Sequence, residues 1–120
     1  MSTLTISNLN DGTTTVPTTF VTNGSAKAWV TKNSGGTSIE DSFNVSSITD
    51  VSNATVDYTF INSMSNDDYS FATGVRNDGL RFFTTPLTNI TTSSLRIRSY
   101  NNSGTLSDRE SGTQIHGDLA

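Results

Sequence analysis

The amino-acid sequence predicts a small all-β domain, an antiparallel β-sandwich or barrel with an extended N-terminal arm and a C-terminal tail. Three observations favour this fold class. Thr, Ser and Asn fill 51 of the 120 positions, and these residues favour strands and turns over helix interiors. Apolar residues alternate with polar ones over several short runs, and no stretch has a helical period. These runs recur about every 8–14 residues, as they do in sandwiches and small barrels.

Residues 1–25 predict the extended arm. Their apolar side chains are isolated among Thr, Ser, Asn and Gly, and Pro17 interrupts the one short run that could form an edge strand. Such a segment cannot fold on itself, so we expect it to lie on the body or on a neighbouring subunit. Hydrophobic residues make up only 32% of the chain. Because the apolar core is small, we expect both flanking segments to bind to other copies of this chain or to other proteins.

Residues 26–104 form the predicted sandwich body of six or seven strands. Alternating runs lie at 26–30, 39–45, 54–60, 69–75, 80–84 and 95–98. We expect the second and third runs to pair as a hairpin with a long loop, with Asp41 marking a bulge or the start of the strand. Asp78-Gly79 predicts a tight turn, because this pair tolerates the positive φ that such turns need. The fourth and fifth runs should therefore pair with each other.

Residues 105–120 lack sustained alternation and predict the C-terminal tail. The apolar residues of this segment are Leu106, Ile115 and Leu119. They are either docking points on a partner or simply exposed, and the sequence favours neither interpretation.

Composition excludes several functional classes. The chain has no Cys and a formal net charge of −4, which excludes disulfides and argues against nucleic acid as a partner. No apolar run approaches the ~18 residues needed to span a bilayer. The first residues lack the basic and apolar regions of a secretory signal. We therefore expect a soluble protein that is made in a cytoplasm and is neither membrane-inserted nor dependent on a cofactor.

No group of residues predicts catalysis or metal binding. His116 is the only histidine and lies in the predicted tail, where nothing would orient its imidazole. The neighbouring acids Glu40 and Asp41 would point to opposite faces of a strand, and so would Asp67 and Asp68. None of these acids has the ligand spacing of a calcium loop. We expect a non-enzymatic protein without a metal site.

Six side chains are candidates for an interface or a glycan site. Trp29 and Phe83 have the opposite parity to the apolar residues of their runs, which predicts that they face outward. Four arginines could bind an anionic sugar, a phosphate or carboxylates of a neighbour, or could form a solvated face. Because the chain is acidic overall, we favour pairing between subunits with Asp. These arginines are Arg76, Arg81, Arg96 and Arg98.

Segments of the predicted body carry a resemblance to a known family. They are Gly24-Ser-Ala-Lys-Ala-Trp-Val30, Asp41-Ser-Phe-Asn-Val-Ser-Ser-Ile-Thr-Asp50, Asp57-Tyr-Thr-Phe60, Met64 and Asp68-Tyr-Ser-Phe71. Together they resemble a module of the virion structural and tail-fibre-like proteins of tailed bacteriophages, especially those of marine bacteria and cyanobacteria. The resemblance covers about residues 4–75. The chain departs from the family in the turn at 31–36, where Thr-Lys-Asn-Ser-Gly-Gly stands in place of the usual Gly-Thr turn.

This resemblance implies a bacteriophage virion structural protein on the particle exterior. It implies a homotrimer that contacts other virion proteins, as a tail-fibre-like, receptor-binding or adaptor module. A capsid decoration (cement) protein is the alternative, and a stand-alone carbohydrate-binding module is a third possibility. Host surface glycan is then a candidate ligand, and the absence of shaft repeats favours a free-standing module.

Overall fold

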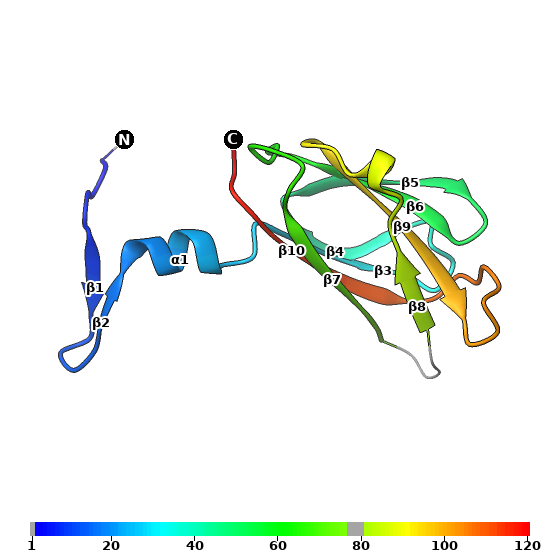
Figure 1. Cartoon of the computed structure of the whole chain (residues 1–120), viewed down its shortest axis with the longest axis horizontal. Helices are drawn as coiled ribbons and strands as arrows, with labels where there is room; N and C mark the ends of the chain where they lie inside the picture. The colour runs from blue at the N-terminus through cyan, green and yellow to red at the C-terminus, as the bar shows by residue number, and fades with distance from the viewer. Residues whose placement is uncertain (1, 77–80) are drawn as a thin grey trace.

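The computed structural model describes residues 2–76 and 81–120, and it shows a two-sheet β-sandwich with the N-terminal segment projecting from one end (Figure 1). The predicted all-β class is confirmed. The first sheet has the strand order β4 (Ile39–Phe43), β3 (Ala28–Lys32), β10 (Ser111–His116) and β7 (Ser70–Val75). The second has the order β5 (Val45–Ser52), β6 (Thr55–Phe60), β9 (Ser94–Asn101) and β8 (Arg81–Thr84). All pairings are antiparallel, and the short 3₁₀ helix η1 (Leu87–Asn89) lies between β8 and β9.

The core lies between the two sheets, and strand alternation decides which side chains enter it. On β3, Ala28 and Val30 point inward, and on β9 the inward residues are Leu95 and Ile97. Tyr58 of β6 is fully buried between the sheets. Because each strand contributes only two or three inward side chains, a chain with few apolar residues can still fill this core.

Asn44 moves the chain from the first sheet to the second. It separates β4 from β5 and has a positive φ of 57°, a conformation that Asn tolerates better than most residues. Its amide Nδ2 donates to the Lys27 carbonyl at 3.0 Å and to the Asn62 carbonyl at 3.1 Å. Its Oδ1 accepts from the backbone N–H of Asn62 at 2.8 Å. The predicted strand over 39–45 is therefore broken one residue before its end.

The hairpin predicted between the second and third alternating runs, 39–45 and 54–60, is wrong. The second run is mostly β4, which pairs with β3 in the first sheet. The hairpin partner of β6 is β5, most of which we expected to be loop, and only Asn53 and Ala54 connect these two strands.

Asp41 was expected to mark a bulge or the start of the strand. The β3–β4 register does shift here, but Asp41 pairs with Thr31 and Ile39 with Lys32, so the extra residue is Glu40.

The predicted pairing of the fourth and fifth alternating runs is wrong. Strand β7 pairs with β10 in the first sheet, whereas β8 pairs with β9 in the second. The chain thus crosses between sheets where we expected a hairpin. The Asp78-Gly79 turn itself lies outside the described residues.

The prediction of a C-terminal tail over 105–120 is wrong for residues 111–116. They form β10, which lies between β3 and β7 in the first sheet (Figure 1). Ile115 is fully buried, together with Ser111 and Thr113. The inward positions of this strand are thus mostly hydroxyl residues, which is why its alternation was not recognised as a strand. Residues 105–120 are therefore part of the sandwich body and not a separate tail.

The N-terminal segment is not merely extended. It forms a hairpin of β1 (Asn8–Asn10) and β2 (Thr15–Pro17), followed by the helix α1 (Thr18–Gly24). Asp11 holds the hairpin turn, since its Oδ1 accepts from the backbone N–H groups of Thr13 at 2.9 Å and Thr14 at 2.7 Å. Residues 2–25 are called the arm below.

Candidate functional site

The arm projects away from the sandwich (Figure 1). The radius of gyration is 16.6 Å and the longest extent is 51 Å, whereas a compact chain of this length has a radius of about 14 Å. No residue of α1 is buried against the described part of the chain. The expectation that the arm lies on the body of its own chain is therefore not met.

Apolar side chains on the arm are open to solvent. Leu4 is 81% exposed and Phe20 is 71% exposed, and Ile6, Leu9 and Val21 are also exposed. Complete burial of a side chain of this size contributes about 1.5–3 kcal/mol. The arm thus carries exposed apolar surface that the sandwich of the same chain does not cover.

A hollow of about 470 Å³ lies where the arm joins the body. Its apolar lining includes Phe43 and Leu119, which are 55% and 44% exposed. Lys27 and Asp118 lie at the same hollow and supply opposite charges. Large exposed apolar side chains gathered beside a cavity are typical of a protein–protein contact.

A second hollow, which we call the trough, lies on the outer face of the first sheet and has a volume of about 500 Å³. Its residues form two rows that follow the strand register. The first row runs through Trp29, Gln114 and Ala72, and the second through Thr31, Gly112 and Gly74. Gly112 lies directly opposite Gly74, and a Cβ atom on either would meet no described atom within 4 Å. The trough is hollow because its floor has no side chains there.

An ionic cluster is built around Arg76, which lines the trough. Arg76 Nη1 lies 2.6 Å from Glu40 Oε2 and 2.9 Å from Glu110 Oε1, so one guanidinium links residues from three separate segments. The side chains of Arg76 and Glu40 are 49% and 43% exposed, and ion pairs this exposed contribute little to stability. The cluster does hold two carboxylates and a guanidinium in fixed positions beside the trough.

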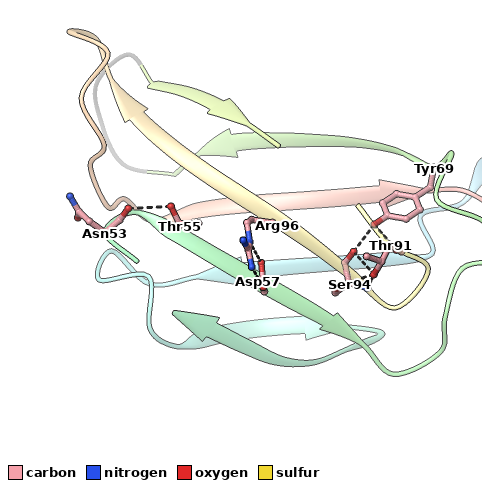
Figure 2. Close-up of polar contacts among 7 residues, drawn as sticks. All are labelled: Asn53, Thr55, Asp57, Tyr69, Thr91, Ser94 and Arg96. Carbon is pink, nitrogen blue, oxygen red and sulfur yellow. Dashed lines mark hydrogen bonds and ion pairs between the residues drawn. The ribbon is translucent and has the colours of Figure 1, made fainter. Parts of the chain in front are cut away.

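The outer face of the second sheet is polar and paired within the chain. Arg96 Nε donates to Asp57 Oδ1 and Arg96 Nη2 to Asp57 Oδ2, both at 2.7 Å (Figure 2). These hydrogen bonds raise the pKa of the Arg96 guanidinium. Arg98 lies on the same face as Arg96, two residues along β9, where it is opposite Thr55 and Thr84.

The structure separates the six predicted site residues. Trp29 and Arg76 lie together at the trough, whereas Arg96 and Arg98 lie on the other sheet. Phe83 does not face outward: it packs against the core, opposite the buried Ser99. The Arg81 side chain lies outside the described residues. Arg76 and Arg96 pair with carboxylates of the same chain, and pairing between subunits stays a prediction.

Several trough residues were missed from the sequence. Gln114, Gly112 and Glu110 were assigned to a tail, and Gly74 was hidden in an apolar run. The signal that could have found them is the alternation of Ser111, Thr113 and Ile115 with Gly112, Gln114 and His116, provided that hydroxyl residues are accepted as inward positions.

His116 lies at the end of β10, opposite Ser70, and not in a tail. Within residues 2–76 and 81–120, no group of three His, Cys, Asp or Glu residues could hold a metal ion. No helix in the same part of the chain is long and apolar enough to cross a membrane. Comparison with known proteins found no matching family, no similar curated protein and no similar solved structure.

Proposed function

We propose that this protein is a structural module on the exterior of a bacteriophage particle, where it assembles as a homotrimer through its arm. The observation that carries the proposal is the arm itself, which presents Leu4, Phe20 and Val21 to solvent and contacts almost nothing on its own body. The resemblance of residues 4–75 to virion and tail-fibre-like modules supports the location. A tail-fibre-like or adaptor role comes first, and capsid decoration is the alternative.

The arm and the hollow at its base are complementary surfaces of the same chain. The helix α1 presents Phe20, and the hollow presents Phe43 and Leu119. In the proposed assembly, the arm of one copy lies in the hollow of the next. Such a contact joins different surfaces of identical chains, and it closes into a ring when the rotation between neighbours is one third of a turn.

This contact is tested by the mass of the protein in solution. Light scattering of the full chain should give three times the 12.8 kDa of one chain. Phe20→Ser and Leu119→Ser should each shift the mass toward that of one chain, because each removes one side of the same contact. Val51→Ser is the matched control, since Val51 is 41% exposed on the second sheet and away from the contact. A monomer at micromolar concentration for the unaltered chain would contradict the proposed assembly.

The location is tested on the particle. Antibodies raised against the chain should label the outside of intact purified particles in electron microscopy. Label at the tail supports the fibre or adaptor role, and label over the capsid lattice supports decoration. The proposal fails if purified particles lack the chain by mass spectrometry.

A further inference from the structure

The dimensions of the trough match a single sugar ring. Its two rows are two residues apart along the strands, about 7 Å, and it extends across neighbouring strands spaced about 4.8 Å apart. Its volume of about 500 Å³ is within the usual range of small-molecule sites, about 300–1,000 Å³. Because Gly112 and Gly74 lack side chains, a ligand can lie directly on the sheet backbone.

The walls of the trough combine one aromatic ring with neutral polar groups. Trp29 is half-buried on the outer face of β3, between Phe43 on β4 and Gln114 on β10. An indole offers a flat apolar surface with low conformational entropy, and the C–H face of a pyranose packs on such a surface. The Gln114 amide and the Thr31 hydroxyl both donate and accept hydrogen bonds, as sugar hydroxyls do.

The charge at the trough selects against anions. Glu40 and Glu110 together carry one more negative charge than Arg76 neutralises, and the whole chain has a net charge of −4. Of these three residues, Arg76 lines the trough, and its guanidinium is already paired with both carboxylates. A sulfate, phosphate or sialic acid would meet a net repulsive site.

We propose that the trough binds a neutral hexopyranose unit of a glycan, with the sugar ring stacked on Trp29 and its hydroxyls bonded to Gln114 and Thr31. This site goes beyond the proposed assembly role, because it uses the sheet face and not the arm. Contacts with one sugar unit are few, so the binding of a monovalent sugar is weak, with a dissociation constant in the millimolar range. Several copies in one particle would strengthen attachment through multivalency.

The test is titration of the ¹⁵N-labelled full chain with neutral oligosaccharides of glucose, galactose, mannose and N-acetylglucosamine, followed by NMR. The methyl glycoside of sialic acid, which carries no neutral hexose, is the anionic comparison. We expect at least one neutral sugar to shift the Trp29 indole N–H and the Gly112 amide resonances, and the sialic acid glycoside to leave both unchanged. If no neutral sugar shifts them at millimolar concentration, or if only the sialic acid glycoside does, the proposal is overturned.

Gly112→Val provides the site variant, because the added side chain enters open space and β-branched residues suit strands. It should fold and lose sugar binding at least tenfold. Thr49→Val, on the exposed face of the second sheet, is the matched control and should bind as the unaltered chain does. Unchanged binding by Gly112→Val would overturn the site. A changed oligomeric mass of Gly112→Val would also overturn it, because the trough would then be a contact between copies.

Discussion

Replacing Asn44 tests how the chain is held at the point where it changes sheets. In Asn44→Ala, the carbonyls of Lys27 and Asn62 and the backbone N–H of Asn62 each lose a partner from the Asn44 side chain. Asn44 is only 7% exposed, so water replaces these partners poorly. The variant also places Ala at a φ of 57°, where a side chain without local hydrogen bonds is strained.

The expected loss of stability is large for a single residue. The Asn44 side chain makes four hydrogen bonds, and the three to backbone groups, at about 1 kcal/mol each, account for about 3 kcal/mol. Water can replace the fourth, which the exposed Asn62 side-chain amide donates to Asn44 Oδ1 at 3.0 Å. The positive φ adds about 1 kcal/mol, for a total of about 4 kcal/mol. Asn44→Gly loses the same hydrogen bonds, but glycine adopts a positive φ without strain. Its free energy of unfolding should therefore fall by about 3 kcal/mol. Domains of this kind have a total stability of about 5–15 kcal/mol, so the alanine variant should be close to unfolding.

The measurement is urea denaturation followed by the fluorescence of Trp29, the only tryptophan in the chain, with linear extrapolation to water. Asn102→Ala is the control, because Asn102 is exposed and should change stability by less than about 0.5 kcal/mol. If both Asn44 variants stay within about 1 kcal/mol of the unaltered chain, the side-chain hydrogen bonds are not what holds this crossing. If alanine is no worse than glycine, the backbone argument is wrong.

Two further predictions concern buried tyrosines. Tyr69 donates from its hydroxyl to the carbonyls of Thr91 at 3.0 Å and Ser94 at 2.9 Å (Figure 2), whereas the buried Tyr58 hydroxyl has no well-formed hydrogen bond to the described residues. Calorimetry should therefore show Tyr69→Phe losing about 1–2 kcal/mol and Tyr58→Phe changing by less than about 1 kcal/mol; equal losses would contradict this assignment. Burial raises the pKa of both hydroxyls from 10 to about 12, so the unfolded chain releases these protons first and stability should fall as pH rises from 10 toward 12. Thermal unfolding followed by circular dichroism at several pH values should show this loss of stability, and the loss should be smaller in Tyr58→Phe. If stability does not change between pH 10 and 12, the predicted direction of the pH dependence is wrong.

The sequence alone determined the fold class and the positions of most strands. Period-two alternation placed β3, β6, β7 and β9, because less exposed residues recur at every second position along each of these strands. It also correctly placed Arg96 and Arg98 on one face. Alternation reports which residues share a face of one strand, and that information is local.

The partners of each strand were decided only by the tertiary structure. Strand β10 was missed because Ser111 and Thr113 are buried although they are polar, and only the neighbouring strands make those positions inward. Phe83 was placed on the wrong face because the predicted run, 80–84, has only five residues, which are too few to define which side of the strand is apolar. The Asp78-Gly79 signal did not reveal that β7 and β8 belong to different sheets.

The trough shows the same limit most clearly. Its residues come from the start, the middle and the end of the chain, with Trp29 on β3, Gly74 on β7 and Gly112 on β10. Trp29 was singled out by its parity, but Gly74 and Gly112 are unremarkable in their own segments, because a glycine in a strand carries no sign of what lies opposite. The sequence shows which residue types lie near one another along the chain. A site of this kind exists only where strands that are distant in the sequence pair and bring their residues into register.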